Sequence, residues 1–521
     1  MNGAERLLET LIDSGIELCL ANPGTSEMQL VSAIGDSDSM RAVLCLFEGV
    51  VSGAADGYAR MTDKPAITLL HLGSGFSNSM ANQHNAKRAH VPLINIVGDH
   101  ATYHLKYDAP LTSDVPAHAR LSSEWVAVSD SADDLAACGA KAVQASMQGW
   151  GRIATLVAPA NHAWEPSTVR SPALELASMD KVAGSAMDKT AKALNNGKRT
   201  ALFMGGRALR EDSLWAAGKI AKACGADLLC ETFPARLQRG VGRVPVQRLP
   251  YFAEQAAEAL SQYEQLILVG SAAPVSFFAY PGKESWLAPA SCEVITLAAV
   301  HQDTVSALRD LAARLGAEDE PDTIPPAQKP VSSPTGELTP LAMAQTVAQL
   351  IPENAIVSDE AATCGLAMFP STVQCPTHDW LTLTGGAIGQ GLPLSLGAAL
   401  ACPDRKVVSL QADGSAMYTV QALWTMAREN TDVTVVIMNN RSYAILNIEL
   451  ARVGAGQPTP KTLSMLDLSR PGLDWVSISK GMGVPATRAN TAEEFHQQFE
   501  QAMAHKGPRL IEAMVIQQMP D

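Results

Sequence analysis

The stretch KVVSLQADGSAMYTVQALWTMARENTDVTVVIMNNRSY, residues 406–443, decides the fold. Its apolar runs predict buried strands over 406–411 and 433–438, with a helix over 417–429 between them. A strand, helix, strand unit of this kind is right-handed and brings the carboxyl ends of both strands to one edge of a parallel sheet. The residues that follow the two strands are therefore expected to lie close together.

Asp413 and Asn440 stand just beyond these two strands. A carboxylate, an amide oxygen and a main-chain carbonyl are the hard oxygen ligands with which proteins bind Mg²⁺ beside phosphate oxygens. Gly414 lets the backbone approach a phosphate, and the N-terminus of the following helix favours its negative charge. Each turn alone is ordinary loop chemistry. Together, at the ends of successive strands, they predict a site for a metal ion and a diphosphate.

The same alternation of apolar strands and amphipathic helices extends along the whole chain, for example in PAITLLHL, PLINIVGD and QLILVGSA. It predicts an α/β protein with three doubly wound parallel-sheet domains, which agrees with 521 residues at about 150 per domain. Polar, proline-containing stretches at Glu165–Asp180 and Glu320–Pro340 predict linkers. The expected domains are therefore 1–165, 181–320 and 341–521.

Composition limits the partners. The net charge is −14 and no run of Lys and Arg occurs, so neither nucleic acid nor an anionic membrane surface is expected as a partner. No apolar stretch approaches the roughly 20 residues of a membrane span. The acidic N-terminal segment is not typical of a signal peptide, and the nine cysteines form no CxxC pair. A cytoplasmic location is expected.

Residues 406–443 resemble the signature of thiamin-diphosphate enzymes, Gly-Asp-Gly-Ser followed by Asn-Asn, with Ala412 in place of the first glycine. The resemblance is closest to the branch that holds acetolactate synthase and benzoylformate decarboxylase. It implies three metal ligands, which are the side chains of Asp413 and Asn440 and the carbonyl of Ser442. It also implies three residues along the diphosphate, which are Gly414, Ser415 and Tyr443.

Glu48 follows the apolar run Val43–Phe47 and begins a helix of small residues. An acid in the first turn is favoured by the helix dipole, which would by itself explain Glu48. The segment is similar, however, to the pyrimidine-binding region of the same family. That resemblance implies that Glu48 hydrogen-bonds the aminopyrimidine ring of thiamin diphosphate and activates the cofactor for proton transfer.

The glycine-rich segment LTLTGGAIGQGLPLSLGAAL, residues 381–400, contains one bulky apolar residue among its glycines, Ile388. A glycine-rich turn that leads into a buried helix explains this pattern without any ligand. By the resemblance, the Gly386 carbonyl accepts a hydrogen bond from the 4′-amino group of the cofactor, and Ile388 bends the cofactor between its two rings. The three segments follow one another in the order found in the family, so the resemblance spans essentially the whole chain, although it is thin in the middle third.

The substrate residues are less distinct. Thr25 falls where benzoylformate decarboxylase has a substrate-contacting serine, and His71 falls on an active-site histidine, although a histidine at a strand end is also explained as a structural group. The central segment 271–283 lacks the second active-site histidine of that enzyme. Three aromatic residues stand there instead, Phe277, Phe278 and Tyr280.

The resemblance implies an enzyme that uses thiamin diphosphate and Mg²⁺ on a 2-oxo acid. Either decarboxylation to an aldehyde or carboligation to an acyloin fits, and the sequence leaves the choice and the particular acid open. The alternatives are a thiamin-dependent 2-hydroxyacyl-CoA lyase and a non-catalytic regulatory paralogue, although the latter predicts loss of Glu48 or a metal ligand.

In this family the cofactor residues act across a subunit interface, so a homodimer is expected at least and a homotetramer fits. The central domain of this family sometimes carries FAD or ADP, and the segment Met204–Arg210 could face an anionic group. An ordinary strand-to-helix loop explains the segment equally well, so FAD is not supported and nucleotide binding by the central domain stays open. Residues 450–473, rich in Gly and Pro, are expected to form a mobile stretch over the site.

Overall fold

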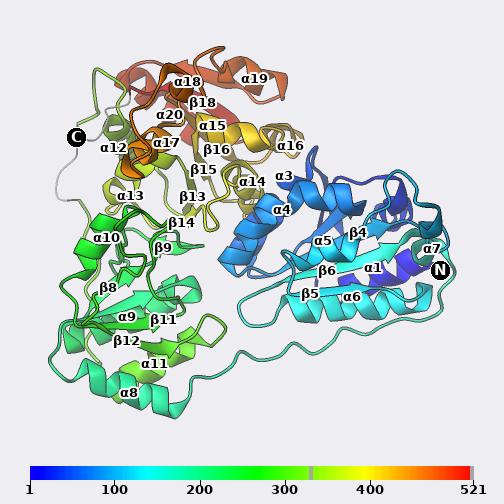
Figure 1. The fold of residues 1–521 in the computed structure, drawn as a ribbon, viewed down its shortest axis with the longest axis horizontal. Helices are drawn as coiled ribbons and strands as arrows, with labels where there is room; N and C mark the ends of the chain where they lie inside the picture. Colours follow the sequence, from blue (N-terminus) through cyan, green and yellow to red (C-terminus); the bar gives the residue numbers. More distant parts are fainter. Residues whose placement is uncertain (328–331, 517–521) are drawn as a thin grey trace.

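The computed structural model describes residues 1–327 and 332–516, which form three α/β domains, each built on its own sheet (Figure 1). The predicted fold class is confirmed. The three sheets lie within the predicted domain ranges, with one exception: strand β9 (Leu237–Arg239) comes from the middle third and joins the C-terminal sheet. The boundaries 1–165, 181–320 and 341–521 themselves stay a prediction.

The N-terminal domain is a parallel six-stranded sheet in the order β2-β1-β3-β4-β6-β5. Its strands are β1 (Leu18–Ala21), β2 (Arg41–Leu44), β3 (Ile67–His71), β4 (Leu93–Asp99), β5 (Trp125–Val128) and β6 (Ile153–Pro159). Its helices are α1 (Gly3–Asp13), α2 (Met28–Gly35), α3 (Glu48–Thr62), α4 (Leu72–Ala89), α5 (Val115–Arg120), α6 (Ala132–Ser146) and α7 (Ala160–Trp164), with short 3₁₀ turns at η1 (Thr25–Glu27) and η2 (Leu105–Tyr107). Every residue of β4 and β6 is buried, as expected for strands covered by helices on both faces.

The central domain is a parallel five-stranded sheet in the order β10-β8-β7-β11-β12. Its strands are β7 (Thr200–Met204), β8 (Asp227–Cys230), β10 (Gln247–Arg248), β11 (Gln265–Val269) and β12 (Glu293–Ala298). Its helices are α8 (Gly184–Leu194), α9 (Glu211–Cys224), α10 (Ala253–Leu260) and α11 (Thr304–Arg314), with a 3₁₀ turn at η3 (Gly206–Leu209).

The C-terminal domain is a seven-stranded sheet in the order β17-β18-β16-β15-β13-β14-β9, parallel except for β9. Its own strands are β13 (Ala355–Glu360), β14 (His378–Thr382), β15 (Val407–Ala412), β16 (Val433–Asn439), β17 (Ala486–Ala489) and β18 (Arg509–Met514). Its helices are α12 (Pro340–Leu350), α13 (Met368–Ser371), α14 (Gly391–Ala401), α15 (Asp413–Ala416), α16 (Ala422–Arg428), α17 (Ala444–Arg452), α18 (Pro460–Ser464), α19 (Trp475–Gly481) and α20 (Ala492–Ala504), with 3₁₀ turns at η4 (Ala362–Ala367) and η5 (Met417–Thr419).

The helix predicted over 417–429 has different bounds in the structure. Helical backbone begins earlier, with α15 at Asp413, passes through η5 and continues in α16, which ends at Arg428. Because of the earlier start, Asp413 is the first helical residue after β15. The next residue, Gly414, donates its backbone N–H to the Asp413 carboxylate. Likewise, helix α17 occupies the start of the stretch 450–473, and α18 lies within it.

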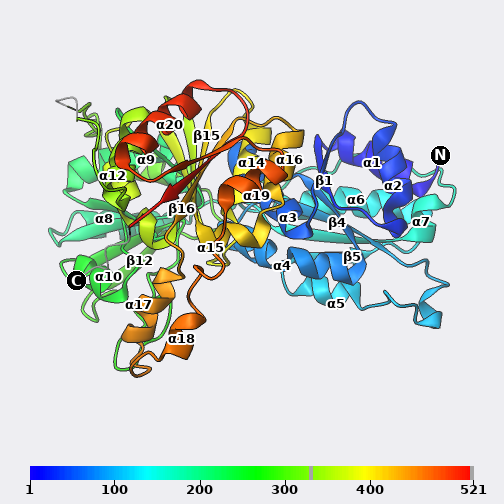
Figure 2. The ribbon, with the colours of Figure 1, turned by 90° about the horizontal axis from the view of Figure 1, so that it is seen from above.

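Helices α3 and α14 join the N- and C-terminal domains in close contact (Figures 1 and 2). Glycines make this approach possible, because a Cβ atom on Gly57 would lie 2.1 Å from the Leu394 carbonyl oxygen. A Cβ atom on Gly397 would likewise lie 1.9 Å from the Ala54 carbonyl oxygen. One apolar core is continuous through this contact and includes residues of both domains, such as Val50 and Leu392.

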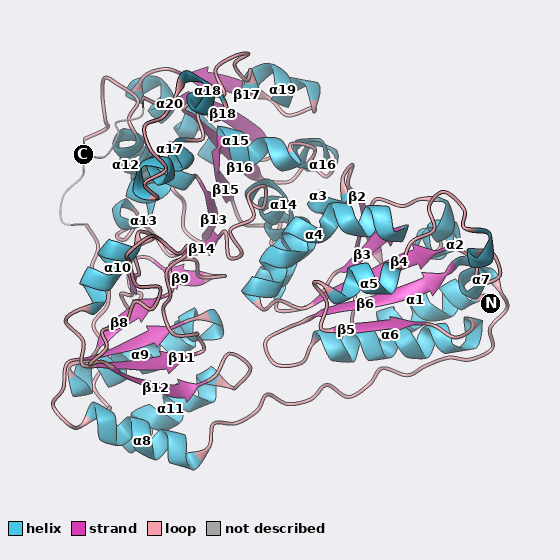
Figure 3. Ribbon diagram, in the orientation of Figure 1, coloured by secondary structure: helices cyan, strands magenta, loops and turns pink. Residues whose placement is uncertain are grey.

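The two predicted linkers lie between the domains, as the loops in Figure 3 show. Residues 165–183 run as extended chain between α7 and α8, along the outside of the molecule. The stretch 320–340 lies between α11 and α12, and its residues 328–331 fall outside the described residues. In the part of the chain that the structure describes, no helix is long and apolar enough to cross a bilayer.

Candidate functional site

The carboxyl ends of β15 and β16 carry the predicted metal residues. The two strands are neighbours, with Ala412 opposite Met438, so the residues just beyond them meet at one edge of the sheet. The backbone N–H of Arg441, next to Asn440, donates a hydrogen bond of 2.8 Å to Asp413 Oδ2. The predicted convergence of Asp413 and Asn440 is therefore confirmed at the level of the backbone.

Asp413 is only 1% exposed, and its two oxygens accept hydrogen bonds from the backbone N–H groups of Gly414 (2.9 Å) and Arg441. Burial raises the pKa of this carboxyl to about 6, although the two N–H groups oppose the shift. A desolvated carboxylate held only by neutral donors is costly to ionise, and a bound cation would relieve that cost. Its environment therefore fits a metal ligand.

The neighbouring residues complete an oxygen-rich loop. Asn440 Oδ1 accepts a hydrogen bond of 3.0 Å from the Ser442 N–H, which fixes the turn that carries the Ser442 carbonyl. Gly414 permits a close approach, because a Cβ atom there would lie 2.4 Å from the Tyr443 ring. Ser415 is buried in the first turn of α15. These positions suit a small cation and a diphosphate along the helix N-terminus.

The predicted metal site contains few ionisable side chains. Among the described residues, no group of three or more His, Cys, Asp and Glu side chains could hold a metal ion. The predicted set contains only one such side chain, Asp413, and relies on an amide and a main-chain carbonyl. Phosphate oxygens or water would have to supply the remaining ligands of Mg²⁺.

Glu48 is the first residue of α3, as predicted, and is 7% exposed. Its Oε2 accepts a hydrogen bond of 3.0 Å from the Asn78 side chain on α4. The side chains of Glu48 and His71 lie on the same side of Gly75, since a Cβ atom there would be 3.1 Å from Glu48 Oε1 and 3.4 Å from His71 Cβ. The structure thus brings the predicted activating carboxylate and the predicted histidine together.

His71 ends β3 and belongs to a group that the sequence reasoning missed in part. Its Nδ1 lies 2.9 Å from Glu27 Oε2 and 3.1 Å from Ser26 Oγ, and Ser26 in turn donates to Glu27 Oε1 at 2.5 Å. Glu27 is fully buried beside Gly98, where any Cβ atom would lie 1.8 Å from Glu27 Oε1. A proton on Nδ1 shared with this carboxylate leaves Nε2 as the ring nitrogen free to exchange protons.

Thr25, the predicted substrate-contacting residue, is exposed at the start of η1, and its neighbour Ser26 is the residue that contacts His71. Glu27 lies three residues after Gly24 in the turn that follows β1, but this local pattern does not reveal its contact with His71. The Gly24 N–H donates to Glu27 Oε2 at 2.6 Å. Strand β1 pairs with β3, so the turn and His71 share one sheet edge.

The loop 385–391 carries Gly386 and Ile388 and is held from two sides. Glu360, at the end of β13, accepts backbone hydrogen bonds from Gly389 (2.6 Å), Gln390 (3.4 Å) and Gly391 (2.6 Å). Burial raises the pKa of Glu360 to about 7, with these N–H groups acting in the opposite direction.

On its other side the loop 385–391 contacts α4 of the N-terminal domain. The Asn85 side chain donates to the Ala387 carbonyl at 2.8 Å and accepts from the Ala387 N–H at 3.2 Å. Gly386 has a φ of +74°, which suits glycine, and the adjacent Ile388 is half-buried. The loop is therefore fixed by buried polar contacts, while the two predicted cofactor residues at its tip keep accessible surface.

Within one chain the predicted residues form two groups. Glu48 and His71 gather on the N-terminal sheet, where the structure adds Ser26 to them, whereas Asp413, Asn440 and their neighbours gather on the C-terminal sheet. Among the described residues, the hydrogen bonds of Glu48 and of Asp413 have no residue in common. Each group is chemically suited to one end of a long ligand.

The chain matches known protein families at both ends. Residues 1–121 match the family "Thiamine pyrophosphate enzyme, N-terminal TPP binding domain", and residues 365–513 match "Thiamine pyrophosphate enzyme, C-terminal TPP binding domain". The two matches cover the two groups of site residues described above, except that Glu360 lies just before the second.

Three similar proteins cover nearly the full length. One from Mycobacterium tuberculosis, named "Putative acetolactate synthase large subunit", is 50% identical over 519 residues, which are 99% of each chain. Benzoylformate decarboxylase from Pseudomonas aeruginosa is 25% identical over 97% of each chain. The solved structure of a thiamine diphosphate-dependent 4-hydroxybenzoylformate decarboxylase from Rhodococcus jostii RHA1 superposes with a TM-score of 0.87 at 25% identity, over 99% of each chain.

Proposed function

Because this chain belongs to the thiamine pyrophosphate enzymes, of the acetolactate synthase and benzoylformate decarboxylase type, we propose that it uses thiamin diphosphate and Mg²⁺ to act on a 2-oxo acid. The proposed reaction is non-oxidative decarboxylation, carboligation to an acyloin, or both. The observation that carries the proposal is the buried carboxylate Asp413 beside Asn440 at the ends of two adjacent strands.

Thiamin diphosphate would supply an electron sink for the loss of CO₂. The residues of this chain would bind and orient it. Asp413, Asn440 and the Ser442 carbonyl would hold the Mg²⁺ that neutralises the diphosphate, while Gly414, Ser415 and Tyr443 would line it. The Gly386 carbonyl would accept from the amino group of the pyrimidine ring, and Ile388 would support the bend between the rings.

Glu48 would hold a proton at the pyrimidine ring nitrogen. Its burial at the start of α3 and its contact with Asn78 support this role, because a desolvated carboxylate in a fixed position is an effective proton donor and acceptor. His71 would exchange a proton with the substrate through Nε2, with Glu27 fixing the ring and its tautomer from the other nitrogen. Thr25 and Ser26 would lie at the substrate end of this group.

The separation of the two residue groups supports a shared site. We propose that the N-terminal group of one subunit and the C-terminal group of another enclose one cofactor, so that a homodimer is the smallest active unit. A tetramer would be a pair of such dimers. This arrangement uses each group at the end of the ligand that its chemistry suits.

A flavin is not part of the proposal, because Trp150 lies where a nucleotide would enter the central sheet. The strand order reverses between β7 and β11, and ligands of such sheets bind in the crevice at this reversal. Cβ atoms on Gly206 and Gly270, which follow these strands, would lie 1.5 Å and 2.4 Å from the Trp150 ring. The indole is 6% exposed and donates to the Gln302 carbonyl, so it is held in this crevice.

A panel of 2-oxo acids tests the proposed function. The purified protein, with and without thiamin diphosphate and Mg²⁺, is assayed for CO₂, aldehyde and acyloin, and we expect release of CO₂ only when both additions are present. Activity on 2-hydroxyacyl-CoA thioesters alone would favour the lyase alternative. Tight cofactor binding without turnover of any 2-oxo acid or thioester would contradict an enzymatic role on these substrates.

A further inference from the structure

A hairpin of the central domain, residues 274–287, contacts the loop 385–391 of the C-terminal domain. It follows β11, and an antiparallel bridge joins Val275 to Trp286 at its base. The Ser276 N–H donates to the Ser285 carbonyl at 2.7 Å, which closes the hairpin. The segment is thus a defined structure and not merely the connection between β11 and β12.

Phe277, near the tip of this hairpin, lies against Gly386. A Cβ atom on Gly386 would be 2.5 Å from Cζ of the Phe277 ring, so any larger residue there would displace the ring. Gly386 is the residue proposed to accept from the cofactor, and Ile388 is two residues further along the loop. The ring therefore lies within reach of a molecule bound at this loop.

Phe277 belongs to an aromatic cluster that supports it from behind. Its ring centroid is 5.0 Å from that of Phe278, 5.5 Å from Tyr251 and 5.7 Å from Phe233, in tilted and edge-to-face arrangements. Nevertheless, Phe277 is 43% exposed and Phe278 is 54% exposed. Two packed rings thus present apolar surface to the solvent beside the loop 385–391. Burial of that surface against a bound ligand would be favourable.

The hairpin is also tied to the segment that follows the metal loop. The Tyr280 hydroxyl donates to Glu449 Oε2 at 2.7 Å, and the Arg452 guanidinium lies 5.1 Å above the Tyr280 ring. Arg452 pairs with Glu254 at 2.6 Å, on α10 of the central domain. Helix α17, which bears Glu449 and Arg452, begins directly after Tyr443, so the contact links the hairpin to the metal site.

On these grounds we propose that Phe277 is a specificity-determining residue, whose ring covers the apolar substituent of the 2-oxo acid, and that the Tyr280–Glu449 contact is the positioning element that holds it there. The inference rests on the proposed function. Residues 275–279 carry no charged side chain, so this wall would leave a charged substituent desolvated without a partner. It favours a flat, apolar substituent over the methyl group of pyruvate.

The test compares phenyl and methyl substituents on the full-length protein loaded with thiamin diphosphate and Mg²⁺. Values of kcat and KM are measured for benzoylformate and pyruvate, together with the affinities of benzoylphosphonate and acetylphosphonate esters as unreactive analogues. We expect Phe277→Ala to lower the phenyl-to-methyl preference about tenfold, mainly through KM and analogue affinity, since an aromatic pair contributes on the order of one factor of ten. Phe277→Tyr should retain the preference.

Two further variants separate position from structure. Tyr280→Phe keeps the ring but loses the hydroxyl bond to Glu449, and it should lower the phenyl-to-methyl preference in part, through KM and analogue affinity. Trp215→Ala is the matched control, because Trp215 is an exposed aromatic residue of the same domain on α9, and it should change nothing.

Two outcomes would overturn the inference. One is an unchanged phenyl-to-methyl preference in Phe277→Ala, with or without a changed oligomeric state, and the other is a higher preference, which would mean that the ring only fills space. Failure of the proposed function looks different. In that case the wild-type protein turns over no 2-oxo acid at all, and the analogue affinities still decide the role of Phe277. Equal affinities of wild type and Phe277→Ala for the phenyl analogue would then refute it.

Discussion

At the scale of single residues, the site depends on two buried carboxylates whose hydrogen-bond donors among the described residues are all neutral. An amide N–H₂ group donates to Glu48, and two backbone N–H groups donate to Asp413. Such buried carboxylates lower the stability of the fold. A protein retains them where a ligand provides the missing charge or proton. The two residues therefore make separable predictions, one about proton transfer and one about binding.

Replacing Glu48 with Gln should abolish turnover while cofactor binding remains measurable. The amide preserves the shape and a hydrogen bond but cannot hold the proton that the pyrimidine ring nitrogen must share. CO₂ release and a calorimetric titration with thiamin diphosphate and Mg²⁺ give the two readings. Glu17→Gln, at an exposed position of the same domain, is the control and should behave as wild type. Full activity in Glu48→Gln would refute the assignment of this residue.

Replacing Asp413 with Ala should weaken Mg²⁺ and thiamin diphosphate binding together, by about tenfold to a hundredfold, because the variant removes the one carboxylate of the metal site. Isothermal titration of cofactor at several Mg²⁺ concentrations measures this coupling. Asp404→Ala, on the exposed turn before β15, removes the same charge away from the site. Unchanged affinity in Asp413→Ala would show that the metal is held elsewhere.

The sequence predicted Asp413, Asn440 and Glu48 because each follows a strongly apolar strand, and strand ends are legible from local pattern. Glu27 could not be found in this way. Its contact with His71 depends on β1 pairing with β3 and on the absence of a side chain at Gly98, which are properties of the sheet and not of the local sequence. The contact of Ser26, and not of its neighbour Thr25, with His71 likewise depends on the pairing of β1 with β3.

At the scale of elements, the loop 385–391 and strand β13 act as one unit through Glu360. Three backbone N–H groups of the loop point to a single buried carboxylate. The loop was predicted from its glycines, but its anchor was not, since Glu360 precedes it by 25 residues or more and lies on another strand. The same limit applies to β9, which crosses from the middle third into the C-terminal sheet and is only three residues long.

The free energy of unfolding should depend on pH through the protonation of Glu360. Its pKa is raised from 4.5 to about 7 by burial, so the folded state binds the proton more tightly than the unfolded state. The contribution to stability is thus fully present below the unfolded pKa and is lost as the pH rises from 4.5 to 7, by about 3 kcal/mol at most. The neutral variant Glu360→Gln lacks this dependence.

The measurable quantity is the difference in unfolding midpoint between wild type and Glu360→Gln across pH 4.5 to 8, a range that includes both the ordinary pKa of 4.5 and the raised pKa of about 7. Wild type should lose stability relative to the variant as the pH rises through this interval. Glu493→Gln, whose carboxylate accepts from the exposed Gly336 N–H, serves as the control. A pH-independent difference between wild type and Glu360→Gln would contradict a raised pKa.

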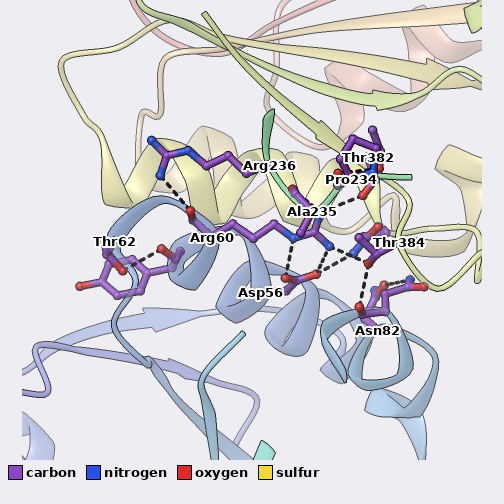
Figure 4. Close-up of polar contacts among 12 residues, drawn as sticks. Asp56, Arg60, Thr62, Asn82, Pro234, Ala235, Arg236, Thr382 and Thr384 are labelled. Atoms are coloured by element: carbon purple, nitrogen blue, oxygen red, sulfur yellow. Dashed lines mark hydrogen bonds and ion pairs between the residues drawn. The ribbon is translucent and has the colours of Figure 1, made fainter. Parts of the chain in front are cut away.

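At the scale of the whole molecule, Arg60 of the N-terminal domain contacts two later parts of the chain (Figure 4). It is 1% exposed and forms a two-bonded ion pair with Asp56 at 2.8 Å on its own helix α3. Its guanidinium also donates to the carbonyls of Ala235 (3.0 Å), in the middle third, and Thr382 (2.8 Å), on β14. Arg60 thus adds a buried polar contact between the N- and C-terminal domains to the packing of α3 against α14.

Arg60→Met should destabilise the protein by about 3–5 kcal/mol, because it leaves the Asp56 charge buried without its partner. The unfolding midpoint in denaturant measures the loss. The double variant Arg60→Met with Asp56→Asn removes both charges and should recover part of it, which distinguishes an unpaired charge from lost packing. Arg170→Met, which breaks an exposed ion pair with Asp13, is the control and should have little effect. A double variant no better than Arg60→Met would contradict the electrostatic explanation.

If two subunits share each site, two inactive variants should complement each other. In a homodimer, the Glu48 of one chain and the Asp413 of the other would serve the same cofactor. A dimer of one Glu48→Gln chain and one Asp413→Ala chain then contains one site with both defects and one site with none.

Co-expression of these two inactive variants should therefore restore CO₂ release. With random pairing, half of the dimers are mixed and half of their sites are intact, so about a quarter of the wild-type activity is expected. Differently tagged chains allow the mixed dimers to be isolated and assayed alone, where the activity should rise to about half. If Glu48 and Asp413 of one chain served the same cofactor, every site in the mixture would carry a defect. Activity no greater than the sum of the two variants would thus place each complete site within a single chain.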